Sequence, residues 1–325
     1  MRLNTVAYAE RKSIIPKNTF LAVIYLIILI FVIICIVSIT SAWKITHPGK
    51  ITTPQITSNI APNYKNISFT TNESEEKING WFFSSQGAKT TVLVVHSYGK
   101  NRLQFDEETF KLIAGLTNKG LNVMTFDLRG SGNSAGSITT FGRNETTDVL
   151  SAIKYLKQQG TENIILMGFS TGASSCLSAV SQTPYKDSII GVIADSPYSK
   201  IDNYIDYAIE SESWLPAIPF KYTITFAVNK ISKITEEMDI IPKIPSIIPT
   251  PVLFIDGAQD ELSASDNTKL LYELYFRKNP VPVDYWNSKA QEYGQSFLEF
   301  PDQYINKVID FVDVCVEDAK NANKN

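Results

Sequence analysis

Histidine is scarce in this sequence, which has only two among 325 residues, His47 and His96. Enzymes that activate a serine or cysteine nucleophile usually rely on a histidine as the base. Such chemistry in this chain must therefore use one of these two residues or a base of another type. His47 lies in a stretch rich in threonine and proline, where we expect it to be solvated and without a catalytic role.

Cysteine is also rare, and its three positions, Cys35, Cys176 and Cys315, lie far apart. This spacing argues against a dense disulfide framework and against a zinc cluster built on cysteine. We expect neither a metal ion nor an organic cofactor. The net charge is −3, so the sequence lacks the basic excess typical of nucleic-acid binding, and we expect no nucleic-acid partner.

Charge is absent from one long segment, Phe20–Ile39. A helix of that length, at about 1.5 Å per residue, spans roughly 30 Å, the thickness of the hydrocarbon core. A signal peptide cleaved at Thr40–Ala42 is the alternative, although its apolar core is usually only about 7–15 residues long. We therefore predict that 20–39 is an uncleaved transmembrane helix, with the membrane as its partner.

Basic residues flank this segment unequally. Four precede it and two follow it closely: Arg2, Arg11, Lys12 and Lys17, then Lys44 and Lys50. Since basic flanks favour the cytoplasm, we predict a cytoplasmic segment at 1–19, a single pass through the plasma membrane and an extracytoplasmic domain. Residues 40–65, without helical or strand periodicity, are predicted to form a spacer, and 320–325 a disordered tail.

From 66 to 319 the sequence alternates between short apolar runs and longer amphipathic segments. The runs predict strands at 66–71, 78–83, 90–96, 121–127, 162–168, 188–195, 251–257 and 281–287. The amphipathic segments predict helices at 106–120, 145–160, 173–182 and 301–319. Strands that alternate with helices form a mostly parallel sheet with helices on both faces, so the predicted fold class is α/β.

The alternation stops between about 198 and 250. Within it, 203–230 reads as two amphipathic or apolar helices. Two interpretations remain open at this point: a lid over a site, or helices that pack on the sheet edge.

The sequence Gly168–Gly172, GFSTG, matches the G-x-S-x-G turn that presents a nucleophilic serine. The motif gains its specificity from context, because it follows a buried strand and opens a helix, as it does here. Glycine at 168 and 172 lets the turn close, since a Cβ would crowd it. The start of the helix directs the N–H of Thr171 towards an oxyanion formed at Ser170.

From about Asn66 to Ala319 the chain resembles the α/β-hydrolase superfamily. It is most similar to bacterial membrane-anchored members of the serine aminopeptidase and prolyl-oligopeptidase-like branch. The matching stretches, in the family's order, are VLVVHSYGKNR, FDLRGSGNSAG, LMGFSTGA, IADSPYS, PVLFIDGAQDE and AQEYGQSFLEFPDQYINKVIDFV. The resemblance implies an α/β-hydrolase fold with a helical lid insertion and a serine-hydrolase activity.

The resemblance also implies roles for single residues. Ser170 corresponds to the nucleophile and Asp260 to the triad acid, with Asp195 as the back-up acid. Asp256 lies at the end of the strand that Asp260 follows, at a position where relatives commonly have histidine. The backbone N–H groups of Tyr98 and Thr171 correspond to the oxyanion donors.

Three residues depart from the pattern of relatives. Ser97 replaces a glycine beside the oxyanion segment, Ser131 replaces a histidine in RGSG, and Tyr293 stands where the catalytic histidine belongs. A tyrosine has a pKa near 10, so only about one in a thousand is ionised at pH 7. His96 is the other candidate base, although in relatives this histidine braces the neighbouring loop.

Two hypotheses follow. The chain is either a surface-anchored hydrolase of an ester, amide or peptide, weakened by the missing histidine, or a non-catalytic descendant that binds a lipid, peptide or protein. A small-molecule, acyl or peptide group is the expected substrate or ligand.

Overall fold

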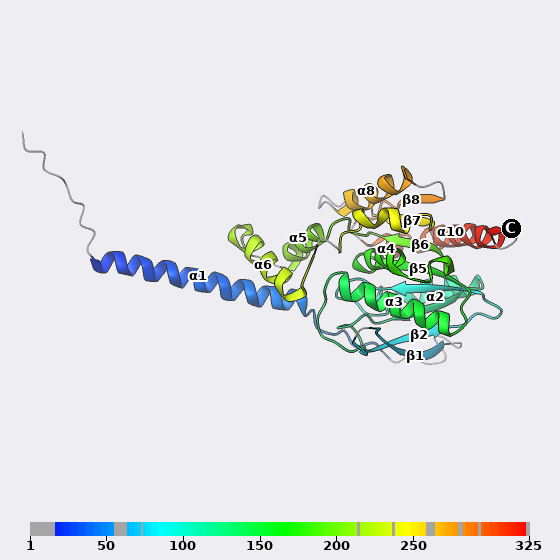
Figure 1. Cartoon of the computed structure of the whole chain (residues 1–325), viewed down its shortest axis with the longest axis horizontal. Helices are drawn as coiled ribbons and strands as arrows, with labels where there is room; N and C mark the ends of the chain where they lie inside the picture. The colour runs from blue at the N-terminus through cyan, green and yellow to red at the C-terminus, as the bar shows by residue number, and fades with distance from the viewer. Residues whose placement is uncertain are drawn as a thin grey trace, which may run out of the picture.

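The short apolar runs of the sequence form one central sheet in the computed structural model (Figure 1). The structure describes residues 17–54, 64–72, 74–212, 215–235, 238–257, 264–278, 282–291 and 294–322. The strands are β1 Tyr64–Thr70, β2 Lys77–Phe83, β3 Thr90–Val95, β4 Asn122–Phe126, β5 Asn163–Phe169, β6 Ile189–Asp195, β7 Val252–Asp256 and β8 Val283–Asn287.

The strand order across the sheet is β1-β2-β4-β3-β5-β6-β7-β8. β1 pairs antiparallel with β2, and β2 with β4, whereas β3 to β8 are all parallel. The central strands β3, β5 and β6 are apolar along almost their whole length because helices bury both of their faces. The predicted mostly parallel α/β sheet is confirmed.

The described helices differ widely in length. They are α1 Lys17–Thr46, α2 Thr109–Asn118, α3 Arg143–Gln158, α4 Thr171–Gln182, α5 Ile201–Glu212, α6 Ala217–Ser232, α7 Ile244–Ile247, α8 Ala264–Phe276, α9 Ser296–Glu299 and α10 Pro301–Ala322, with short 3-10 turns η1 Asp106–Glu108, η2 Lys186–Ser188 and η4 Ile241–Lys243. α3 and α4 contribute to the core on one face of the sheet, and α2 and α10 to the core on the other. α8 lies in a segment where the sequence pattern predicts no helix.

The apolar N-terminal segment is part of one long helix, α1, which leaves the domain at one end (Figure 1). By length and composition Asn18–Thr46 is able to cross a membrane, a character that anchors and signal sequences share. The side chains in the middle of α1 are mostly exposed, as those of a lipid-facing helix would be.

The predicted spacer at 40–65 is wrong at its start, because α1 continues to Thr46. Ala42 and Ile45 are buried in the core of the domain, and the N–H of Thr139 donates to the carbonyl of Thr46 at 2.9 Å. This tertiary packing extends the helix where the local sequence gives no helical signal. Lys50 donates to the carbonyl of Ser134 at 2.5 Å, so the chain stays on the domain after the helix ends.

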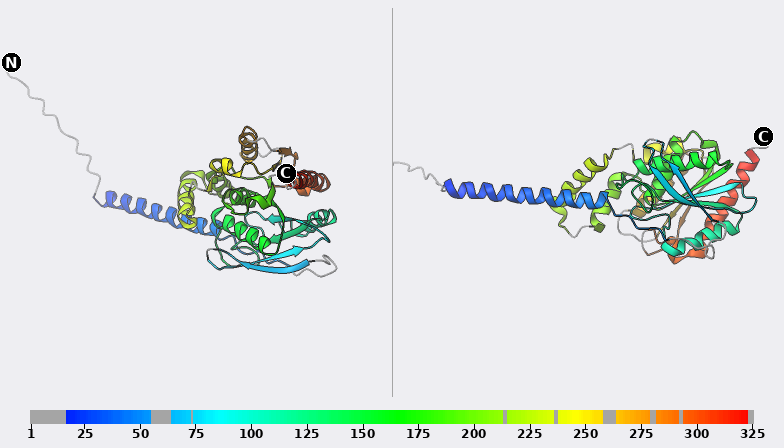
Figure 2. Two further views of the ribbon diagram at one scale, coloured as in Figure 1. Left: turned by 45° about the vertical axis from the view of Figure 1, so that its right-hand side comes forward. Right: turned by 90° about the horizontal axis from the view of Figure 1, so that it is seen from below.

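The two helices predicted within 203–230 are present as α5 and α6. They project from the domain on the side where α1 leaves it (Figure 2). α6 lies along the domain end of α1, and the hydroxyl groups of Ser38 and Thr223 are 2.6 Å apart. α5 carries Tyr204, which lines a cavity at the sheet.

Candidate active site

Ser170 lies between β5 and α4, at the carboxyl edge of the parallel strands. Its backbone has φ 50° and ψ −115°, a conformation that residues with a Cβ rarely adopt. Its backbone N–H donates to the carbonyl of Asp195 at 2.8 Å. This combination is the strained strand-to-helix turn that lifts a serine above the sheet.

The glycines on either side permit this turn. A Cβ on Gly168 would lie 2.5 Å from the carbonyl oxygen of Gly172, and a Cβ on Gly172 would lie 2.5 Å from the carbonyl oxygens of Val95 and His96. These neighbours are backbone atoms, which cannot rotate away as a side chain can. The steric reason predicted for glycine at both positions is confirmed.

A cavity of about 290 Å³ opens beside Ser170. Side chains from the turn, the strand ends and α5 line it, among them Ser170, Asp195, Tyr98 and Tyr204. Gly294 and Gln295 also line it, so the segment that follows residue 293 reaches the same cavity. Tyr293 itself and Asp260 lie outside the described residues.

Two carboxylates end β6 and β7, the first and second strands on one side of β5. Asp195 ends β6 and is 1 % exposed; one of its oxygens accepts from the hydroxyl of Ser196 at 2.7 Å and the other from Tyr304 at 2.8 Å. Burial raises the pKa of Asp195 to about 6, although both hydrogen bonds oppose the shift. Asp256 ends β7, is also buried, and accepts from the hydroxyl of Tyr285 at 3.3 Å.

His96 is not available as a base, because both of its ring nitrogens are engaged. The backbone N–H of Leu128 donates to Nε2 at 3.0 Å, so the ring proton sits on Nδ1, 2.8 Å from the carbonyl oxygen of Ser97. Burial lowers the pKa of His96 and keeps the ring neutral. His96 thus braces the loop after β3, as the resemblance implies, and the hypothesis that it acts as the base is wrong.

The other histidine packs against the end of α1. His47 stacks on Trp43 with ring centroids 3.8 Å apart, and its Nδ1 is 3.0 Å from the hydroxyl of Thr46. Among the described residues, no histidine lines the cavity of Ser170.

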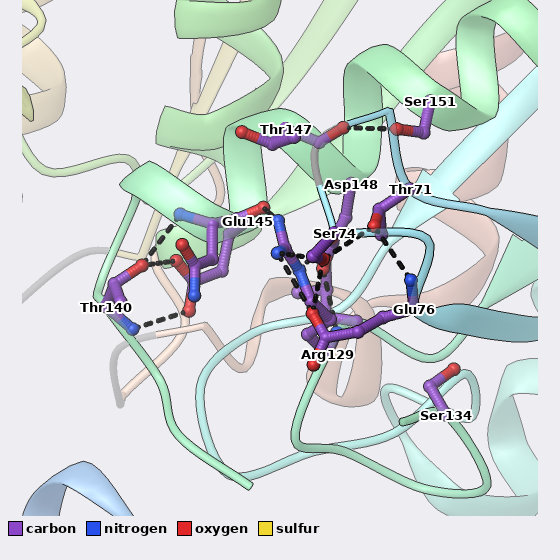
Figure 3. Close-up of polar contacts among 12 residues, drawn as sticks. Thr71, Ser74, Glu76, Arg129, Ser134, Thr140, Glu145, Thr147, Asp148 and Ser151 are labelled. Atoms are coloured by element: carbon purple, nitrogen blue, oxygen red, sulfur yellow. Dashed lines mark hydrogen bonds and ion pairs between the residues drawn. The ribbon is translucent and has the colours of Figure 1, made fainter. Parts of the chain in front are cut away.

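The loop after β4, which supplies the N–H of Leu128, is itself held by buried charge. Arg129 donates through Nε to Asp148 of α3 at 2.6 Å and through Nη1 to Glu76 at 3.1 Å (Figure 3). Asp127 accepts two side-chain hydrogen bonds from Arg102. Ser131, the second departure from the pattern of relatives, lies in this turn, where its N–H donates to Leu128 at 3.0 Å.

One of the two expected oxyanion donors, the N–H of Tyr98, already has an acceptor on the residue that carries the other. The backbone N–H of Tyr98 donates to the hydroxyl of Thr171 at 2.9 Å. The N–H of Ser97, the residue that replaces glycine, donates to the side chain of Gln104 at 2.7 Å. The role of Tyr98 as an oxyanion donor therefore stays a prediction that requires the Thr171 hydroxyl to move. No pattern in the sequence indicates this contact.

The described part of the chain offers no cluster of metal-binding side chains. No group of three or more histidine, cysteine, aspartate or glutamate side chains is arranged there to hold an ion. Cys176 and Cys315 are buried and unlinked.

Comparisons with known proteins agree with this geometry. The family model described as serine aminopeptidase, S33, matches residues 86–232, a region that contains Ser170 and ends before Asp260 and Tyr293. The uncharacterized protein YqkD of Bacillus subtilis is 25% identical over 242 residues, covering 73% of this chain and 75% of that protein.

Solved structures extend the match to most of the domain. The Pyrococcus furiosus esterase Pf2001 superposes with a TM-score of 0.66 at 26% identity, covering 81% of this chain and 97% of that one. A thermostable carboxyl esterase from Bacillus coagulans superposes with a TM-score of 0.59 at 11% identity, covering 78% and 99%. The second likeness concerns the fold alone.

Proposed function

Because this chain is a member of the α/β-hydrolase superfamily, we propose that it is a membrane-anchored serine hydrolase that cleaves an ester, amide or peptide bond with Ser170. The observation that carries the proposal is the strained backbone of Ser170 beside a cavity. Backbone strain beside a cavity is a feature of functional sites, and it is what suggests a functional role for this serine. The esterase likeness of Pf2001 supports the reaction class.

In the proposed reaction, Ser170 Oγ attacks the carbonyl carbon and its proton passes to a base. The N–H of Thr171, and that of Tyr98 once the Thr171 hydroxyl has moved, stabilise the oxyanion. The leaving group departs with a proton, and water then releases the acyl group from Ser170. Asp260 and Tyr293 occupy the sequence positions of the acid and the base. Supplying a phenolate at pH 7 costs roughly 4 kcal/mol, so we expect slow turnover.

A non-catalytic binding protein is the second candidate, and one contact favours it. The hydrogen bond from Tyr98 to Thr171 occupies a donor that an efficient hydrolase keeps open. In this case the cavity would hold a lipid, peptide or protein segment without cleaving it.

Labelling with a fluorophosphonate separates the two candidates, because only an activated serine reacts with it. We expect slow labelling of the wild type that Ser170→Ala abolishes, with unchanged folding since the hydroxyl supports little packing. A wild type that binds ligand but never reacts would favour the binding protein. Esterase activity that survives Ser170→Ala would show that the nucleophile is another residue.

The membrane anchor is tested separately. We expect the protein to fractionate with membranes and protease added outside intact cells to digest its domain. Recovery of the intact domain from the medium would identify α1 as a cleaved signal instead.

A further inference from the structure

α6 exposes large apolar side chains on its outer side. Ile218, Tyr222 and Phe226 are 77%, 70% and 66% exposed. Tyr222 and Phe226 are one helical turn apart and share a face, and Ile218 precedes the first full turn. We call these three residues the α6 outer face. Exposure of such a row of apolar side chains to water is unfavourable in free energy. It indicates a surface that is covered by an apolar environment.

The position of α6 along α1 identifies that phase. The contact between Ser38 and Thr223 places this face beside the last apolar turns of the Phe20–Ile39 segment. Ser232, at the end of α6, donates to Thr139, whose N–H donates to Thr46 at the end of α1. Both helices therefore run towards the domain in the same direction, and Tyr222 and Phe226 lie within about one turn, or 5 Å, of the level of Ser38.

The charges of α6 fit the same placement. Lys230 follows the α6 outer face by one turn towards the domain, and its Nζ lies 5.5 Å from the ring of Phe226. A cation at this level can reach the lipid headgroups while its stem covers the ring. On the side facing α5, Lys221 pairs with Asp206 at 3.2 Å and Glu210 at 3.3 Å. In the described part of the hairpin, Lys221 is thus paired within it, and Lys230 lies towards its domain end.

We propose that the α6 outer face contacts the acyl chains of the leaflet on the domain side, so that the α5–α6 hairpin is seated in the membrane surface. The inference rests on the proposed membrane anchor, because α1 sets the depth of α6. The exposed apolar surface of α1 continues directly into the α6 outer face, and lipid is the one phase that covers both. Tyr204 of α5 lines the cavity of Ser170, so the same hairpin joins the lipid surface to the site.

Fluorescence quenching in the reconstituted full chain tests this placement. Cys35 is changed to alanine, and an NBD fluorophore is attached to a single new cysteine in Tyr222→Cys, Ile28→Cys or Val314→Cys; Cys176 and Cys315 stay because they are buried. Ile28 lies in the middle of α1. Val314, on α10 at the opposite end of the molecule (Figure 1), is a matched exposed apolar control at 45% exposure. The vesicles are phosphatidylcholine with and without acyl-chain nitroxide lipid.

We expect nitroxide lipid to reduce the fluorescence at 222 and 28 by about twofold or more and to leave 314 nearly unchanged. Quenching at 28 without quenching at 222 would overturn the inference and leave the anchor standing. Quenching at neither position would overturn both. A label at 222 that is shielded from water yet unquenched by nitroxide lipid would mean that protein covers the face, which also overturns the inference.

Discussion

The proposed site has a nucleophile half, the turn at Ser170, and an acid–base half, to which the proposal assigns Asp260 and Tyr293 with Asp195 as the back-up acid. The described members of the two halves, Ser170 and Asp195, are held in different ways. Ser170 is fixed by backbone atoms. Glycine at 168 and 172 lets neighbouring carbonyl oxygens lie only 2.5 Å from the point where a Cβ would be. Asp195 is fixed by side chains, through the hydroxyl groups of Ser196 and Tyr304. The conformation of Ser170 thus depends on main-chain atoms, and the position of the Asp195 carboxylate depends on single side chains.

Under the proposed function, this difference accounts for an intact GFSTG together with Tyr293 at the position that the resemblance gives to the catalytic histidine. Replacing one side chain on the acid–base half removes a catalytic group and leaves the sheet and turn unchanged. A substitution at the glycines of the nucleophile half displaces the backbone of the turn and lowers the free energy of unfolding. Retention of the turn therefore reports on the fold, and an active mechanism requires its own test.

The largest effect is expected from breaking the nucleophile half. Gly172→Ala places a Cβ 2.5 Å from two carbonyl oxygens, and we expect a loss of about 3 kcal/mol or more in the free energy of unfolding. Urea unfolding of the full chain in detergent measures it. Gly160→Ala is the control, because its φ is +83° and no atom lies within 4 Å; it should cost only about 1–2 kcal/mol. Equal losses would show that crowding at the turn is not the cause.

Titration of Asp195, the described member of the acid–base half, is expected to make the free energy of unfolding depend on pH. In the unfolded chain Asp195 has a pKa near 3.9, and in the folded chain about 6. Below about pH 4 both states are protonated, and as pH rises to about 6 the folded state loses stability, by roughly 3 kcal/mol in total. This cost then stays constant at higher pH.

Asp195→Asn removes that titration and keeps a partner for both hydroxyl groups. Relative to the wild type, the variant should therefore gain about 2–3 kcal/mol between pH 4 and pH 8. Thermal unfolding across this range measures the gain. If the difference between variant and wild type does not depend on pH, Asp195 does not carry the raised pKa.

The sequence predicts the nucleophile half better than the rest of the site. The apolar runs and the GFSTG motif are local patterns, formed by residues close together along the chain. The strands and the turn at Ser170 therefore lie where the sequence predicts them. The extension of α1 to Thr46 depends instead on packing of Ala42 and Ile45 against distant parts of the chain. The contact between Tyr98 and Thr171 joins residues 73 positions apart, and no local pattern encodes it.

A smaller effect is expected from placing a histidine at the proposed position of the base. Gly294 and Gln295 line the cavity, so we expect Tyr293→His to bring an imidazole with a pKa near 6.5 close to Ser170. Hydrolysis of a small activated ester should rise by at least about tenfold, since a positioned base contributes roughly 10²–10⁴-fold. Tyr293→Phe, which adds no base, should show no gain. A wild type that turns over briskly and loses its activity in Tyr293→Phe would identify the tyrosine as the base.

The smallest effect is expected from the contact between Tyr98 and Thr171, the residues that carry the two proposed oxyanion donors. The Tyr98 N–H donates to the Thr171 hydroxyl at 2.9 Å, and it must release this partner to bind an oxyanion. A neutral hydrogen bond contributes about 1 kcal/mol net, so Thr171→Ala should raise kcat for the activated ester by roughly fivefold. The backbone N–H of residue 171 remains in place in this variant. Thr171→Ser is the matched control, because it keeps the hydroxyl and should leave kcat close to the wild-type value. If Thr171→Ala instead lowers kcat while Thr171→Ser retains it, the hydroxyl assists the reaction, and the bond from Tyr98 positions a catalytic group rather than blocking a donor.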